Sequence, residues 1–377
     1  MAEAARKPDR GLLAACERQA PTVLERTFEL SKIPAPPLDE IDRIRRVRQW
    51  WESDGLTVTQ HAVGNLWAQV RPGSGGFGPA IVVAAHLDTV FSRDVRHGLR
   101  YDAEGRVVGP GCGDDTVAVA ALSVLDELLP AEVALPVWIV ATVGEEGLGD
   151  LAGARDALAH PPVGVGTFIA LEGNYLGRVN TIGVGSERRR VRLTSQGGHA
   201  WEESTAPSAV HTAAEMVHAI EQIQIDHTAK TSRNVGILSG GESINSRAIH
   251  ASFDLDLRSE DPDALAELVT KAEAVLTAGY KGTKVDVEQL GSRPAGRIAA
   301  DHELAIASAE ALAEVGLTAR FTAASTDANV AYSVGIPAVT LGITYGDGTH
   351  TEDEWIDPNA IDFGLYALVR TIIKWSA

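Results

Sequence analysis

Three short apolar runs constrain the fold of this chain more than any other feature. They are Ile81–Ala85, Leu135–Val143 and Gly166–Leu171, and none of them alternates regularly between polar and apolar residues. Such runs are typical of strands that are buried on both faces of a parallel sheet. The Ala-, Val- and Leu-rich segment Thr116–Leu129 lies between the first two runs and predicts a buried helix. This order of strands and helices predicts a doubly wound α/β fold with a central, mostly parallel sheet.

The residue pattern changes in the middle of the chain. Residues 188–195 and 249–258 alternate between polar and apolar side chains, which is typical of antiparallel strands with one exposed face. Helical segments accompany these strands at Ala206–Gln224 and Pro262–Ala278. Together these elements predict an α+β domain that is inserted into the α/β domain.

After the insert the chain returns to α/β character, with a predicted strand at Pro337–Leu341 and a final helix at 359–375. We therefore expect one domain in two parts, 1–181 and 294–377, with the inserted domain at 182–293. A length of 377 residues suits two domains of ordinary size.

The charge and cysteine content narrow the class of protein. The chain carries 33 basic and 51 acidic residues, for a formal net charge of −18, which argues against a nucleic-acid partner. The two cysteines, Cys16 and Cys112, are too few for a disulfide framework or a Cys-rich zinc site. The N-terminal residues lack the apolar core of a signal peptide, and no apolar run approaches the about 20 residues of a membrane span. We expect a cytoplasmic protein without a membrane partner.

Histidine and acidic residues follow each of the three predicted strands directly. His86 and Asp88 follow the first strand, Glu145 and Glu146 follow the second, and Glu172 follows the third. In doubly wound sheets ligands bind beyond the carboxyl ends of the strands, so we expect these side chains to converge. Two other segments carry the same residue types, Gly113-Asp114-Asp115 and Gly348-Thr349-His350.

Each of these motifs has a structural explanation when it is considered alone. The His-x-Asp motif is compatible with a capped turn, and the Asp114-Asp115 pair with a helix N-cap. Glu145-Glu146 is compatible with a solvated turn, although two adjacent acids at a buried edge repel one another unless a cation is present. His350 is compatible with an ordinary surface residue.

The order and flanking residues of the motifs resemble the M20 family of metallopeptidases and amidohydrolases. The insert then corresponds to the dimerisation, or lid, domain of that family. STDANV and the Asp-Asp pair are similar to the peptidase T and glutamate carboxypeptidase branches, whereas Glu172 is more like the aminoacylase branch. The matching stretches are VVAAHLDTV (Val82–Val90), GPGCGDDT (Gly109–Thr116), TVGEEGLGD (Thr142–Asp150), ALEG (Ala170–Gly173), TSQGGHAW (Thr194–Trp201), STDANV (Ser325–Val330) and GDGTHTEDEW (Gly346–Trp355).

The resemblance implies a site for two divalent metal ions, zinc in the first place, with cobalt or manganese as alternatives. It implies that Asp114 bridges the two ions. His86 and Glu172 would complete one metal site, and Glu146 and His350 would complete the other. Many relatives have Lys after the Asp-Asp pair, where this chain has Thr116.

The resemblance also implies roles outside the ligand set. Glu145 would be the general base, and Asp88 would orient His86. In the insert, His199 would hydrogen-bond the developing oxyanion, and Asn245 and Arg258 would hold a carboxylate or carbonyl of the substrate. The alternatives are a turn histidine for His199 and a surface strand charge for Arg258.

The function expected from these features is hydrolysis of the amide bond of short peptides, by a di- or tripeptidase or an aminopeptidase. An N-acyl-amino-acid amidohydrolase or a glutamate-type carboxypeptidase would use the same metal site. A non-catalytic binding protein on this scaffold is the alternative of another class. A Cys or Ser hydrolase is disfavoured, because the chain has no G-x-S-x-G motif and we expect Cys112 to be a small buried residue. We expect a homodimer formed through the insert, the alternative being a monomer with the insert as a lid.

Overall fold

The computed structural model describes residues 7–75, 78–225 and 228–377 of the chain. These residues form two compact units. The first unit contains the described residues up to Gly183 together with Arg297–Ala377, and the second is Val184–Gly296. The insert predicted from the sequence is 182–293.

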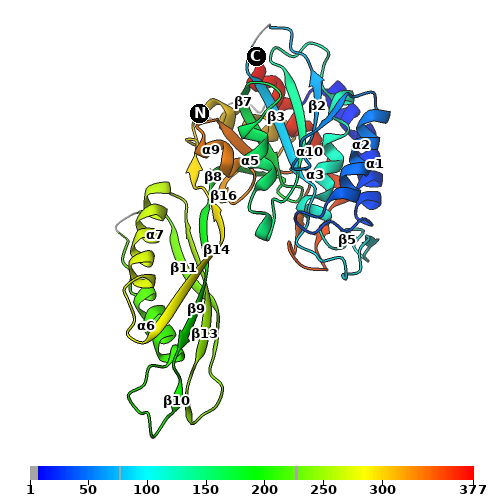
Figure 1. Cartoon of the computed structure of the whole chain (residues 1–377). Helices are drawn as coiled ribbons and strands as arrows, with labels where there is room; N and C mark the ends of the chain where they lie inside the picture. Colours follow the sequence, from blue (N-terminus) through cyan, green and yellow to red (C-terminus); the bar gives the residue numbers. More distant parts are fainter. Residues whose placement is uncertain (1–6, 76–77, 226–227) are drawn as a thin grey trace. The chain divides into compact units, whose positions relative to one another are not determined.

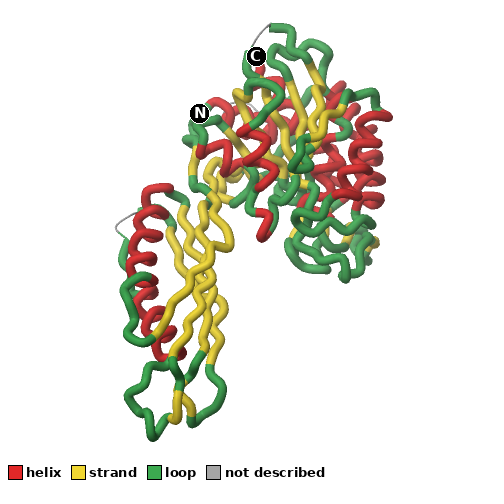
Figure 2. The backbone as a smooth tube through the Cα atoms, viewed as in Figure 1, coloured by secondary structure: helices red, strands yellow, loops and turns green. Residues whose placement is uncertain are grey.

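A sheet of nine strands among the described residues forms the centre of the first unit (Figures 1 and 2). Its inner strands β6, β3, β7 and β17 run parallel to one another, while β2 and β8 run antiparallel to their neighbours in this group. The predicted α/β fold with a central, mostly parallel sheet is therefore confirmed. In sheet order the strands are β1 (Val58–Gln60), β2 (Leu66–Arg71), β6 (Val137–Thr142), β3 (Ala80–His86), β7 (Val165–Leu171), β17 (Ala338–Leu341), β8 (Arg178–Gly183) and β15 (Gly296–Arg297), with β16 (Arg320–Ala324) paired to β8.

Helices cover both faces of this sheet, and the side chains of β3 show why. Alternate residues of a strand point to opposite faces. Ile81 and Val83 pack in the core that contains α1, α2, α3, α8 and α10, whereas Val82 and Ala84 pack with α5 and α9 on the other face. The helices are α1 (Arg10–Leu30), α2 (Ile41–Ser53), α3 (Val117–Leu122), α5 (Ala152–Ala159), α8 (Glu303–Glu314), α9 (Ala328–Ser333) and α10 (Ile361–Ser376), with short turns η2 (Gly147–Gly149) and η3 (Pro358–Ala360).

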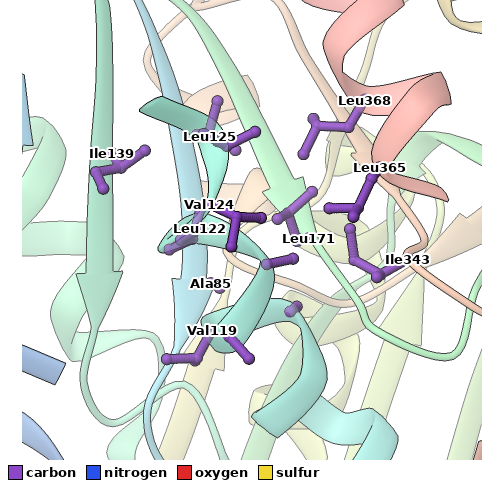
Figure 3. Packing of buried hydrophobic residues seen from close by; sticks show 14 of the residues in the cluster. Ala85, Val119, Leu122, Val124, Leu125, Ile139, Leu171, Ile343, Leu365 and Leu368 are labelled. Atoms are coloured by element: carbon purple, nitrogen blue, oxygen red, sulfur yellow. The ribbon is translucent and has the colours of Figure 1, made fainter. Parts of the chain in front are cut away.

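The larger of the two cores is shown in part in Figure 3, where Leu122 of α3, Leu171 of β7 and Leu365 of α10 come together. All three side chains are buried. Burial of a Leu side chain stabilises the folded state by about 1.5–3 kcal/mol. A strand that is covered on both faces therefore needs apolar residues along its length, as β3 has from Ala80 to Ala85.

The segment Thr116–Leu129, which was predicted to form one helix, is divided in the structure, so that prediction is wrong. The structure has a π-helical turn η1 (Cys112–Thr116), then α3, then a separate short helix α4 (Leu125–Leu128). The break falls at Ser123, whose hydroxyl donates to the main-chain oxygen of Ala120 at 2.5 Å. Such local bonds from a serine compete with the regular bonds of a helix.

A small antiparallel sheet joins two loops of the first unit. Its order is β18 (Gly346–Asp347), β19 (Trp355–Ile356), β5 (Val107–Val108) and β4 (Arg100–Tyr101). Strands of two residues leave no periodic pattern, so the sequence did not predict them. The pairing of β19 with β5 brings the segment after His350 beside the segment that leads to Asp114.

The second unit is an antiparallel sheet with helices on one face. The buried side chains Val191, Phe253 and Leu255 pack against α6 and α7, while Arg190 and Asp254 form an ion pair on the open face, 2.7 Å apart. The elements are β9 (Gly185–Ser195), β10 (Gly198–His199), α6 (Ala209–Glu221), β11 (Thr231–Gly240), β12 (Ser246–Arg247), β13 (His250–Ser259), α7 (Pro262–Leu276) and β14 (Thr283–Arg293), with the main sheet ordered β11-β13-β9-β14.

Two further observations concern the environment of the protein. Within the part of the chain that the structure describes, no helix combines the length and the apolar character needed to cross a bilayer. Cys16 and Cys112 are both free and buried. The cytoplasmic location expected from the sequence stays a prediction.

Candidate active site

The carboxyl ends of three neighbouring parallel strands carry the predicted site residues of the first unit. His86 ends β3, Glu145 and Glu146 follow β6, and Glu172 follows β7. Because β3 pairs with both β6 and β7, these ends lie at one edge of the sheet. All four side chains are buried, with at most 6% exposed.

Asp114 lies at the centre of this group, on the turn η1 that precedes α3. Its Oδ1 is 2.9 Å from Nε2 of His86, and its Oδ2 is 3.1 Å from Nε2 of His350. The same nitrogen of His350 is 3.0 Å from Oε1 of Glu146. Asp114 therefore presents one carboxylate oxygen to each histidine, an arrangement suited to a carboxylate that is shared by two cations.

The ligand atoms form clusters that share members. His86, Asp114 and Glu172 make one cluster, and Asp114, Glu146 and His350 make a second, in each of which the ligand atoms lie within 4.8 Å of one another. Glu145 falls in a third cluster, with His86 and Glu146. The first two clusters have the composition of the two metal sites expected from the sequence, with Asp114 common to both.

The donor set fits divalent metal ions. Nε2 of His86 is buried and has no hydrogen-bond partner among the described residues, although Oδ1 of Asp114 is only 2.9 Å away. Two such atoms that lie close together without hydrogen-bonding are placed to bind a common third atom. Imidazole nitrogens with carboxylate oxygens suit zinc, and also cobalt or manganese.

The electrostatics of the site also call for cations. Burial and the charge of Asp114 raise the pKa of Glu146, and burial with the charges of Asp114 and Asp115 raises the pKa of Glu172 well above its usual range. Burial would also raise the pKa of Asp114, but contacts with His350 and His86 hold it below its usual range. Buried acids this close together repel one another, and bound divalent cations would remove that repulsion.

Asp88 supports the site, but not chiefly in the way expected. Nδ1 of His86 is 3.0 Å from the main-chain oxygen of Asp88 and 3.5 Å from its carboxylate, so the main chain makes the shorter contact. The Asp88 carboxylate instead accepts bonds from the main-chain N–H groups of Glu145 and Glu146, at 3.0 and 2.8 Å. Asp88 thus orients His86 through its backbone and holds the Glu145-Glu146 turn through its side chain.

Asp115 corrects the interpretation of the Asp-Asp pair as a helix cap. Its carboxylate accepts the main-chain N–H of His86 at 3.1 Å and that of Gly173 at 2.9 Å. No side chain caps the start of α3. Asp115 therefore links the ends of β3 and β7 to the turn that carries Asp114.

Arg43 is a buried residue that the sequence interpretation missed. Its Nη1 donates to the main-chain oxygen of Leu87 at 3.0 Å and to the Thr116 hydroxyl at 3.2 Å. Burial lowers its pKa to about 10, against the opposing charges of Asp88 and two further acids. The sequence did contain an indication that Arg43 is buried. It lies on the apolar face of α2, four residues before the buried Val47.

Glu354 is a second buried residue that the sequence interpretation missed. It binds the main chain of the Asp114 turn.

The predicted residues of the insert lie in two places. His199 and Asn245 are neighbours, because β10 pairs with β12 and the main-chain N–H of Ala200 donates to the main-chain oxygen of Asn245 at 2.9 Å. Arg258 lies near the other end of the insert. Strand β13 begins at His250, shortly after Asn245, and Arg258 lies about 26 Å further along this strand, at about 3.3 Å per residue. The structure therefore does not bring Asn245 and Arg258 of one insert together. Nε of Arg258 donates to Asp256 at 2.7 Å.

The exposed His199 has a defined hydrogen-bond role. Its Nδ1 accepts the main-chain N–H groups of Trp201 and Glu202, at 3.3 and 3.4 Å. An accepting Nδ1 places the proton of the neutral ring on Nε2. His199 therefore presents an N–H donor, which is the group that an oxyanion requires.

Comparisons with known proteins place this chain among enzymes. The fold and the clustered histidines and carboxylates are those of the metallopeptidase class of hydrolases. The sequence profile of peptidase family M20/M25/M40 matches residues 82–374, and the chain belongs to that family. A comparison with curated protein sequences gives no significant match.

Solved structures share the whole fold. The aminopeptidase PepT from Bacillus cereus is 20% identical, with a TM-score of 0.77 over 95% of this chain and 98% of that one. A tripeptidase from Staphylococcus aureus is 20% identical, with a TM-score of 0.75 over 95% of this chain and 98% of that one. The YxeP protein of Bacillus subtilis, a dinuclear metal-binding peptidase of family M20, is 16% identical, with a TM-score of 0.67 over 96% of this chain and 98% of that one. At these identities the likeness shows the fold alone.

Proposed function

We propose that this chain is a two-metal peptidase that hydrolyses the amide bond of short peptides, as a di- or tripeptidase or an aminopeptidase. The observation that carries the proposal is the position of Asp114, whose two oxygens face His86 and His350 in two overlapping ligand clusters. The names of the aminopeptidase and tripeptidase structures support the choice of substrate class.

In this proposal His86 and Glu172 would hold one zinc ion, Glu146 and His350 would hold the second, and Asp114 would contribute to both sites. When bound, the two ions polarise the scissile carbonyl and acidify the attacking water. Glu145 accepts the proton of that water and delivers it to the leaving amine. The Asp88 carboxylate accepts the main-chain N–H groups of both Glu145 and Glu146. It therefore fixes the position of the base relative to the neighbouring metal ligand.

The insert supplies the remaining roles in the proposal. His199 donates its Nε2–H to the oxyanion that develops at the scissile carbonyl. Asn245 and Arg258 bind polar groups of the substrate. These two residues lie at opposite ends of one insert, and a tripeptide spans only about 10 Å. One chain therefore cannot supply both, and in this proposal they come from different chains of a homodimer.

The proposal predicts metal-dependent cleavage of short peptides. Protein treated with a chelator should lose activity toward di- and tripeptides and regain it with zinc, cobalt or manganese. N-acyl amino acids and peptides with a C-terminal glutamate, assayed beside them, test the amidohydrolase and carboxypeptidase alternatives. Undiminished hydrolysis by metal-free protein would contradict the metal mechanism. Metal binding without hydrolysis of any of these amides would favour a binding protein.

The role of His199 has its own test. If His199→Ala has the same kcat as the wild type, His199 does not stabilise the oxyanion.

We also propose that the protein is a homodimer joined through the insert. Strand β11 is an edge of the insert sheet, and its Ile237 and Leu238 are 59% and 57% exposed. An edge strand with exposed apolar side chains is a template for pairing with another strand. Light scattering should give twice the mass of one chain, and Ile237→Lys should shift the protein toward monomer. Val287→Lys, on the opposite edge strand β14, is the matched control, and a monomeric wild-type protein would contradict the proposal.

A further inference from the structure

Glu354 is a buried acid next to the candidate metal site that belongs to none of the ligand clusters. Its side chain is 0% exposed, although Glu352 and Asp353 just before it are exposed. Oε1 accepts the main-chain N–H groups of Gly113 and Asp114 at 2.9 and 2.8 Å, and Oε2 accepts that of Gly111 at 2.9 Å. One carboxylate thus binds three N–H groups of the turn that carries Asp114.

The turn is shaped to receive this carboxylate. Gly111 has a φ of +66°, in the left-handed region that favours glycine. A Cβ at Gly113 would meet Oε1 of Glu354 at 2.8 Å, so a side chain there would displace the carboxylate. Successive N–H groups that point into such a turn form a concave anion-binding surface. Burial and the charge of Asp114 raise the pKa of Glu354 well above its usual range, and the bonds from the three N–H groups oppose that rise.

Glu354 also belongs to the segment that carries His350. Its N–H donates to the main-chain oxygen of Thr351 at 3.1 Å, which closes the turn after His350. Its main-chain oxygen accepts the N–H of Gly109 at 2.8 Å. Glu354 is therefore bonded on one side to the turn of His350 and on the other to the turn of Asp114.

We infer that Glu354 is a positioning residue that fixes the main chain of Asp114 relative to His350, so that the two side chains can hold the same metal ion. This inference rests on the proposed two-metal function. Without the carboxylate, three buried N–H groups would lose their acceptor, and the turn would rearrange to satisfy them. The 3.1 Å separation of Asp114 Oδ2 and His350 Nε2 would then no longer be maintained.

The test is the metal affinity of Glu354→Gln in the full-length protein. Glutamine keeps the shape and one oxygen, but its NH₂ group would face one of the N–H donors. Removing the outer partners of metal ligands typically costs 10- to 100-fold in affinity, and we expect a loss of about that size for zinc, measured by competition with a chelator. The visible spectrum of the cobalt-loaded variant should change as well. Glu352→Gln, an exposed acid on the same turn, is the control and should bind zinc like the wild type.

Three outcomes separate the possibilities. If the wild-type protein binds no pair of metal ions, the proposed function fails. Suppose instead that the wild type binds two ions and that Glu354→Gln binds them with equal affinity and an unchanged cobalt spectrum. Then only the role of Glu354 fails. A lower unfolding temperature of the metal-free variant would not rescue that role, because it would show only a structural contribution. If Glu354→Gln does not fold, Glu354→Asp takes its place. The shorter aspartate cannot span all three N–H groups and should also weaken zinc binding, whereas wild-type affinity would overturn the inference.

Discussion

Replacing Glu145 by Gln is expected to lower kcat by about 100- to 10,000-fold, the usual contribution of a general base, while the protein keeps two metal ions per chain. Glutamine has nearly the same shape but cannot accept the proton of the attacking water. The backbone at this position is held by Asp88 through its bond to the Glu145 N–H, a contact that the substitution leaves in place. Steady-state kinetics with elemental analysis of the same sample measure both quantities.

Glu146→Gln is the matched control, because the two acids are neighbours on one turn and Asp88 holds both N–H groups. Glu146 lies 3.0 Å from His350 in a ligand cluster that contains Asp114. This variant should lose metal as well as activity. The reverse result, with metal lost from Glu145→Gln and retained by Glu146→Gln, would mean that base and ligand have been exchanged in the proposal.

The central sheet was predictable because its inner strands are covered on both faces. β3 buries every residue from Ala80 to His86, and all of its residues before His86 are apolar, so its sequence differs from that of an exposed strand. The convergence of His86, Glu146 and Glu172 followed from the same fact, since parallel neighbouring strands end at one edge. The insert was predictable from its opposite pattern, visible in the alternating burial of β13.

Other features depend on contacts between residues far apart in the sequence. The pairing of Trp355 with Val108 in a two-residue strand joins segments almost 250 positions apart and has no local signature. Glu354 follows two exposed acids, and composition alone cannot distinguish it from them. Arg43 is the intermediate case, because the periodicity of α2 places it on the buried face while its charge suggests the exposed one. Such a conflict between position and residue type is a useful indication of a residue that supports a buried charged site.

Asp114→Asn is expected to remove both metal ions and to lower kcat/KM by roughly 1,000-fold or more, because bound ions would lower the pKa of the attacking water to about 7. The reason lies in the two oxygens of Asp114, one facing His86 and the other facing His350. Asparagine offers one neutral oxygen and an NH₂ group, so it can serve at most one of the two sites and without a charge. Elemental analysis after dialysis against zinc, together with peptide kinetics, measures the loss.

Glu172→Gln makes this prediction specific. Glu172 belongs to the cluster with His86 and not to the one with His350, so the Glu172→Gln variant should release one ion and keep the other.

The unfolding temperature provides a second measurement. A ligand present at 100 times its Kd stabilises the folded state by about 2.7 kcal/mol. Zinc should therefore raise the unfolding temperature of the wild type most, that of Glu172→Gln less, and that of Asp114→Asn very little. Retention of one tightly bound ion by Asp114→Asn would show that Asp114 belongs to a single site, and the bridge would have to be assigned to another of the buried carboxylates.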